Sequence, residues 1–233
     1  MSGLNIEDCI ILLDTSRSML RSDFAPSRLK ITIDALITLI EMKFSIGPND
    51  RIGIVTFAEK GHKLQDLTSN KDVLINSLKK VKISGKSDIS DGLALSIQIL
   101  ASEIRKIGGK VIRILLFSDD RLGKMTNRLI KLANAANGLG IFIDSLIAGT
   151  PPRALNYSVM KNLSTITSGD FAYFNNKDAY TKAVHALSSK KDLNDISGYM
   201  EAQEKGRATP LLSEIAVDLR RPTVYEIQEM IAE

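Results

Sequence analysis

Residues 9–18, CIILLDTSRS, join a continuous apolar run to a loop rich in oxygen-bearing side chains. Five consecutive apolar residues predict a strand that is covered on both faces, as in a parallel sheet. The same pattern recurs where Val111–Phe117 is followed by the sequence SDD at 118–120. In an open α/β sheet, ligands bind beyond the carboxyl ends of the strands, where the strand order reverses. We therefore expect Asp14 and Asp119 to lie together at that edge.

Segments with strand and helix patterns alternate along the rest of the chain. Further strands are predicted at Arg51–Phe57, His62–Leu67, Ile141–Ile147 and Phe171–Phe174. Apolar residues at helical spacing predict helices at Arg28–Phe44, Lys71–Lys82, Ser90–Lys106, Thr126–Asn137, Tyr157–Thr165 and Lys177–Leu187. The strand His62–Leu67 follows its predecessor too closely for a crossover helix, so we expect a hairpin there. The predicted fold is α/β: a doubly wound, mostly parallel six-stranded sheet with one antiparallel edge strand and helices on both faces.

Length and composition are those of one main globular domain. The chain has 233 residues, of which 44% are hydrophobic and 25% charged. We expect residues 1–190 to form the domain, and residues 191–233 to form a polar linker and short helices that pack on the domain or bind a partner. No apolar stretch is long enough to span a bilayer, and the first eight residues lack a signal-peptide pattern, so we expect a cytoplasmic protein without membrane contact. The one cysteine, Cys9, excludes an intrachain disulfide.

The charge distribution favours an acidic protein partner over nucleic acid. The net charge is +4, and it comes from the first part of the chain, since the residues from Lys190 onward include 6 basic and 9 acidic side chains. A mildly basic domain suits an acidic partner. No dense run of Lys and Arg with interleaved aromatic residues is present, so we do not expect nucleic acid to be bound directly.

Three loops offer the ligands of a divalent-metal site. Asp14 and Asp119 would supply the charge, and the hydroxyl groups of Ser16, Ser18 and Ser87 would supply neutral oxygens. Mg²⁺ prefers oxygen ligands and is commonly held by one or two carboxylates, with waters or ligand oxygens completing the octahedron. Such a site would remain open to a carboxylate from a partner. We expect Mg²⁺ here, with Mn²⁺ or Ca²⁺ as alternatives. Asp and Ser after a strand are also ordinary turn and cap residues, so one such loop alone is weak evidence.

Other chemistries fit the sequence less well. Gly85-Lys86-Ser87 resembles the end of a phosphate-binding loop, but that pattern needs a glycine where the chain has Lys80. No glycine-rich dinucleotide motif follows the first strand. The two histidines, His62 and His185, stand beside no plausible nucleophile in the sequence, so we do not expect an enzyme.

The pattern Asp14-x-Ser16-x-Ser18 resembles the first element of the metal-ion-dependent adhesion site (MIDAS) in the von Willebrand factor A (vWA) family. This sequence has Ser87 where that family has Thr, and Ser118-Asp119-Asp120 where it has T-D-G. The resemblance implies a Rossmann-like fold and a metal held by Asp14, Ser16, Ser18, Ser87 and Asp119. The segment at 23–29, DFAPSRL, is similar to the A domains of the proteasomal ubiquitin receptor and of transcription factor TFIIH.

These observations predict an intracellular scaffold that binds another protein through its metal site, as a subunit of a larger complex. The resemblance leaves open whether that complex is proteasome-like or belongs to transcription and repair. A structural subunit with an empty metal site is the alternative. A metal-dependent enzyme is the third and weakest hypothesis.

Overall fold

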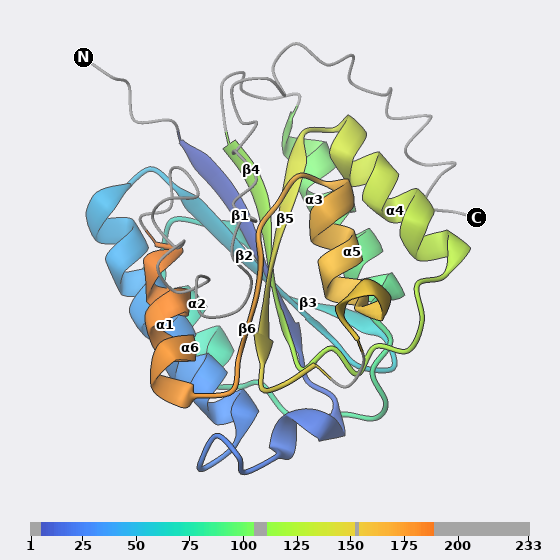
Figure 1. Ribbon diagram of the computed structural model, residues 1–233. Coiled ribbons are helices and arrows are strands. Elements are labelled where there is room, and N and C mark those ends of the chain that lie inside the picture. The colour runs from blue at the N-terminus through green and yellow to red at the C-terminus, as the bar shows by residue number, and fades with distance from the viewer. Residues whose placement is uncertain (1–5, 105–110, 152–153, 189–233) are drawn as a thin grey trace.

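The computed structural model describes residues 6–104, 111–151 and 154–188 and contains a six-stranded sheet (Figure 1). The strands lie in the order β3-β2-β1-β4-β5-β6. Their bounds are β1 (Glu7–Asp14), β2 (Arg51–Phe57), β3 (Gly61–Thr68), β4 (Val111–Ser118), β5 (Ile141–Ala148) and β6 (Phe171–Phe174). The pairs are parallel except for β2 with β3 at the edge, which are antiparallel. The predicted fold class is therefore confirmed.

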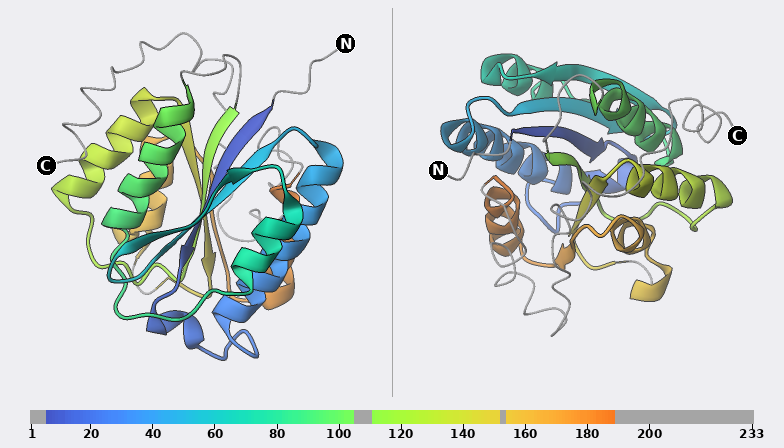
Figure 2. Two further views of the ribbon diagram at one scale, coloured as in Figure 1. Left: turned by 180° about the vertical axis from the view of Figure 1, so that it is seen from behind. Right: turned by 90° about the horizontal axis from the view of Figure 1, so that it is seen from above.

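Helices cover both faces of the sheet, as the view from above shows (Figure 2). One face carries α1 (Arg28–Ile46), α2 (Lys71–Leu78) and α6 (Lys177–Ala186), and the other carries α3 (Ser90–Ile104), α4 (Asn127–Gly138) and α5 (Val159–Ile166). Alternate residues of β1 enter the two cores: Ile11 packs with the first group of helices and Ile10 with the second. Both are fully buried, which explains why β1 is apolar without alternation.

Several helices begin at capping residues that the sequence supplies. The hydroxyl of Ser27 accepts the N–H of Lys30 at the start of α1, and Thr126 and Ser158 cap α4 and α5 in the same way. These bonds satisfy N–H groups that have no partner inside the helix.

Some boundaries differ from the sequence prediction. The helix predicted at Lys71–Lys82 ends at Leu78, so its last four residues were assigned wrongly. Two short 3₁₀ helices, η1 (Arg17–Leu20) and η2 (Leu155–Tyr157), were not predicted, because a single turn leaves no periodic apolar pattern.

The topology places the ends of β1 and β4 side by side. β2 lies on one side of β1 and β4 lies on the other, so the strand order reverses between β1 and β4. Leu13 pairs with Phe117, which brings the loops that follow them together at the carboxyl edge. Among the described residues, no helix is long and apolar enough to cross a membrane. The predicted tail, residues 191–233, lies outside the described part, so the domain boundary stays a prediction.

Candidate metal centre

The loop after β1 is fixed to its neighbours by backbone hydrogen bonds. The N–H of Thr15 donates to the carbonyl of Phe57 at 2.8 Å, which joins the loop to the end of β2. The carbonyl of Thr15 accepts the N–H of Ser84 at 2.8 Å, and the N–H of Arg17 donates to Gly85 at 3.3 Å. The loop before α3 is therefore tied to the loop after β1, which brings Ser87 to the end of the central strand.

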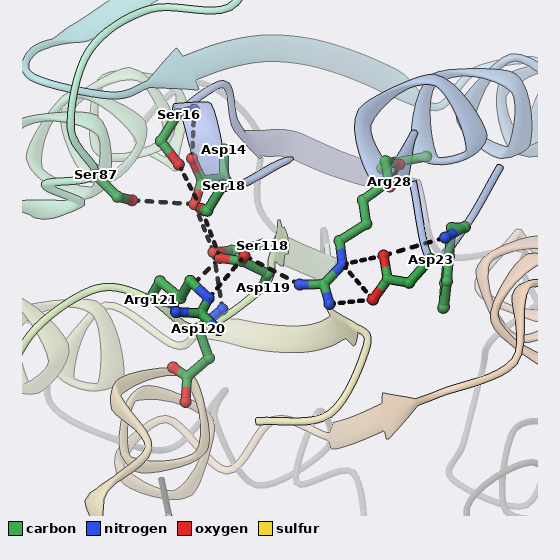
Figure 3. Close-up of polar contacts among 12 residues, drawn as sticks. Asp14, Ser16, Ser18, Asp23, Arg28, Ser87, Ser118, Asp119, Asp120 and Arg121 are labelled. Atoms are coloured by element: carbon green, nitrogen blue, oxygen red, sulfur yellow. Dashed lines mark hydrogen bonds and ion pairs between the residues drawn. The ribbon is translucent and has the colours of Figure 1, made fainter. Parts of the chain in front are cut away.

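Asp14 is the centre of the cluster (Figure 3). Its carboxylate is fully buried. Oδ1 accepts the N–H of Ser16 at 2.7 Å, and Oδ2 accepts the hydroxyl groups of Ser87 at 3.0 Å and Ser118 at 2.6 Å. All three partners are neutral donors, and they come from the loop after β1, the loop before α3 and the end of β4.

Asp119 lies at the other end of the same hydrogen-bonded chain. The hydroxyl of Ser18 donates to its Oδ1 at 3.0 Å, and the hydroxyls of Ser16 and Ser18 are hydrogen-bonded at 3.1 Å. Asp119 is also fully buried. All five residues predicted as metal ligands, Asp14, Ser16, Ser18, Ser87 and Asp119, thus belong to one cluster. Their role as ligands stays a prediction.

The composition of the cluster fits a hard divalent cation. Burial raises the pKa of Asp14, the hydrogen bond from Ser118 opposes this rise, and the charge of Asp119 adds to it. A cation between the two carboxylates would offset both the cost of burying Asp14 and its repulsion by Asp119. Two carboxylates and three hydroxyls form an all-oxygen donor set, which suits Mg²⁺, Mn²⁺ or Ca²⁺. The described residues contain no group of three or more His, Cys, Asp or Glu that could hold a metal, so this centre depends on its serines.

Ser118 belongs to the same cluster, although sequence reasoning did not assign it as a ligand. Its hydroxyl donates to Asp14 and accepts the N–H of Asp120 at 3.1 Å. It therefore orients the Asp14 carboxylate and the turn after β4 together. The sequence could have indicated this role, because Ser118 stands where the T-D-G element of the vWA pattern has Thr.

Asp120 shows how this chain accommodates a departure from the T-D-G pattern. Its φ of 59° lies in the left-handed region that glycine adopts readily and that Asp tolerates better than most residues. Its Oδ1 accepts the N–H of Met160 at 3.1 Å, at the start of α5. Burial raises the pKa of Asp120 to about 6. The side chain that replaces glycine thus caps the helix next to the site.

Arg28 also belongs to the site, although sequence reasoning assigned it no role there. It is the first residue of α1, and its Nη1 donates to Asp119 Oδ2 at 3.0 Å. Its Nε donates to Asp23 Oδ1 at 2.9 Å (Figure 3). Arg121 lies on the same side, with Nε 3.5 Å from Asp119 Oδ2. The DFAPSRL segment contains both Asp23 and Arg28, but the sequence does not show that Arg28 contacts Asp119.

Comparison with known proteins agrees with this architecture. Residues 9–121 match the family model of the von Willebrand factor type A domain. A UPF0353 protein of Mycolicibacterium paratuberculosis is 26% identical over 151 residues, covering 61% of this chain and 44% of that protein. The 26S proteasome non-ATPase regulatory subunit 4 of Caenorhabditis elegans is 26% identical over 144 residues, covering 61% of this chain and 41% of that protein. The chain thus spans less than half the length of these relatives.

Solved structures show the same fold. BatB from Bacteroides thetaiotaomicron has a TM-score of 0.65 and 20% identity, covering 83% of this chain and 98% of that one. The vWA domain of SpRpn10 has a TM-score of 0.59 and 20% identity, covering 72% of this chain and 88% of that one. The resemblance to the proteasomal ubiquitin receptor is confirmed at the level of the domain, and that to TFIIH stays a prediction.

Proposed function

We propose that this protein is an intracellular scaffold that binds another protein through a divalent-metal site. The match of residues 9–121 to the family model of the von Willebrand factor type A domain supports this proposal. Asp14, Ser16, Ser18, Ser87 and Asp119 would hold Mg²⁺ at the carboxyl edge of the sheet. The metal would supply an open coordination position for a carboxylate of the partner. We include a cytoplasmic location and membership of a larger complex in this proposal.

The observation that carries the proposal is the convergence of these oxygens from three loops. Ser16 and Ser18 follow β1, Ser87 precedes α3, and Asp119 follows β4, yet hydrogen bonds connect them all through Asp14 or through one another. Turn or cap roles do not require side chains so far apart in sequence to meet. The hydroxyls here donate to carboxylates or to each other, whereas a nucleophilic serine needs an adjacent base. This arrangement favours binding over catalysis.

The charge around the centre suggests the chemistry of the partner. The loops that contribute to the centre, after β1, before α3 and after β4, carry five exposed basic side chains: Arg17, Arg21, Lys86, Arg121 and Lys124. The exposed acids of these loops have local partners, since Asp23 is paired with Arg28 and Asp88 accepts the N–H of Ser90. Basic side chains around an open metal would attract an acidic segment and speed its association. We therefore propose an acidic protein segment as the ligand.

The proposed complex draws on the relatives. Two of them are named as regulatory subunits of the 26S proteasome, in Caenorhabditis elegans and in Schizosaccharomyces pombe. The names of these two relatives favour a proteasome-like assembly over one for transcription and repair.

Calorimetry and a pulldown together test the proposal. Mg²⁺ and Mn²⁺ should bind the purified chain, and Asp14→Ala or Asp119→Ala should abolish binding. Asp34→Ala is the matched control, because it removes an exposed carboxylate of α1 that pairs with Lys30. Capture of a partner from the source cell should require metal and fail in EDTA. Unchanged metal affinity in both site variants would contradict the assignment.

A structural subunit with an empty metal site is the second candidate. The ion pair between Arg28 and Asp119 favours it, because this pair already compensates one of the two carboxylates. Partner contacts would then lie on the helices. Capture that is insensitive to EDTA and to Asp14→Ala, but is lost on substitution of helix surface residues, would support this candidate over the first.

A further inference from the structure

We propose that Arg28 is a built-in cation of this centre, which competes with a divalent metal for Asp119 and thereby weakens metal binding. The inference rests on the metal site of the proposed function. It assigns to a residue of α1 control over how tightly that site holds its ion.

The two oxygens of Asp119 face different surroundings. Oδ1 accepts the hydroxyl of Ser18 and is part of the ligand cluster. Oδ2 accepts Nη1 of Arg28 at 3.0 Å, and Arg121 Nε lies 3.5 Å from it. One oxygen therefore faces the proposed metal and the other faces two guanidinium groups. Arg28 is the stronger partner of the two, because its side chain is 5% exposed whereas that of Arg121 is 39% exposed.

The two carboxylates of the centre are consequently not equivalent. Asp14 accepts hydrogen bonds from Ser16, Ser87 and Ser118, which are neutral, so its charge is left for the metal. The charge of Asp119 is already compensated by Arg28. A divalent ion entering the cluster would meet one uncompensated carboxylate and a fixed positive charge behind the second. Repulsion between cations in a buried site lowers affinity.

The surroundings hold the guanidinium of Arg28 in place. Its Nε donates to both oxygens of Asp23, at 2.9 and 3.2 Å. Gly149, directly after β5, gives it room: a Cβ at this position would overlap Nη2, and the φ of +101° also favours glycine. A bidentate partner on one side and a glycine-lined space on the other fix the side chain toward Asp119.

Helix formation does not explain an arginine at this position. Arg28 is the first residue of α1, where the helix dipole disfavours a positive charge. The cap of α1 is Ser27, so Arg28 is not needed for it. The carboxylates of Asp23 and Asp119 are what stabilise the guanidinium here.

Titration calorimetry of the full-length chain with MgCl₂ and MnCl₂ tests this inference. Arg28→Gln should bind metal about three- to tenfold more tightly than the wild type, because a buried positive charge is removed. Arg28→Lys keeps the charge and should stay near wild-type affinity. Arg51→Gln is the matched control: it removes an arginine whose partners are Asp8 and Glu103, so metal affinity should not change.

The outcomes separate this inference from the proposed function. Equal or weaker binding in a folded Arg28→Gln variant, with metal binding intact in the wild type, would overturn only the inference. Binding in Arg28→Gln but not in the wild type would support the inference and overturn the metal-dependent function. Binding in neither would overturn both.

A second variant covers the case in which Arg28→Gln does not fold, which thermal melting would show. Asp23 is half exposed, so Asp23→Asn should fold, and it frees the guanidinium of Arg28 to act on Asp119 alone. We expect metal binding to weaken about two- to threefold in this variant. Unchanged or tighter binding would overturn the inference.

Discussion

Replacing Asp120 tests the turn that carries Asp119. Asp120 has a φ of 59°, is 6% exposed, and accepts the N–H of Met160 at the start of α5. Asp120 therefore affects the free energy of unfolding in two ways. Its side chain stabilises the start of α5 as a cap, and its left-handed backbone is strained. Substitutions can separate these two effects.

The structure sets the expected magnitudes. Loss of a capping side chain costs about 1 kcal/mol, and a side chain such as Ala in the left-handed region costs about 1 kcal/mol more than Gly. Asp120→Ala loses the cap and keeps the backbone strain that the wild type already carries, so it should lower the free energy of unfolding by ~1 kcal/mol. Asp120→Gly also loses the cap but relieves the strain, so its stability should lie between that of the Ala variant and that of the wild type. Asp120→Asn keeps an acceptor and tolerates the backbone, so it should remain close to the wild type.

Urea unfolding followed by circular dichroism measures all three variants. It should be run in EDTA at pH 8, above the pKa of about 6 of Asp120, so that its carboxylate is ionised. The expected order of stability is Asn above Gly above Ala. Equal stability of the Ala and Gly variants would refute the left-handed conformation at this position. An Ala variant as stable as the wild type would refute the role of the side chain as a cap.

Three further predictions concern the metal, the partner and the opposite end of the sheet. With Mg²⁺ about tenfold above its Kd, mass action should add roughly 1.4 kcal/mol to stability; the melting temperature should rise for the wild type and not for Asp14→Ala. The double variant Arg17→Glu and Lys86→Glu should slow association with an acidic partner, and the difference from the wild type should shrink at high salt when measured by surface plasmon resonance; an unchanged rate would contradict the basic surface. Lys43→Met removes the cation 2.7 Å from the buried Glu7 carboxylate and should lower the free energy of unfolding, measured in urea, by about 3 kcal/mol. An unchanged free energy of unfolding would show that the pair contributes nothing.

The sequence predicted the strands and the positions of the five candidate ligands because both depend on short-range patterns. A continuous apolar run marks a strand covered on both faces, as β1 shows, and the polar residues after β1 and β4 must lie at one edge once those strands pair in parallel. Arg28 could not be placed in this way. It stands 91 positions from Asp119, and its direction depends on how α1 docks on the sheet and on the space that Gly149 leaves. The cap that Asp120 forms on α5 has the same origin, because Met160 is 40 positions away.

The buried charges of the sheet are compensated differently at its two ends. Near the amino ends of the strands, Glu7 pairs with Lys43, and Asp144 lies 3.2 Å from Arg113. These acids and bases are buried together, so the fold itself supplies the counter-charge that burial demands. Asp14, at the carboxyl edge, is equally buried, but its hydrogen-bond donors are neutral and its pKa is raised. Burying a carboxylate in this way costs stability unless a cation arrives. This unmet charge supports a cation at the carboxyl edge more directly than the D-x-S-x-S spacing does, because it is a physical demand of the folded protein and not a pattern shared with other sequences.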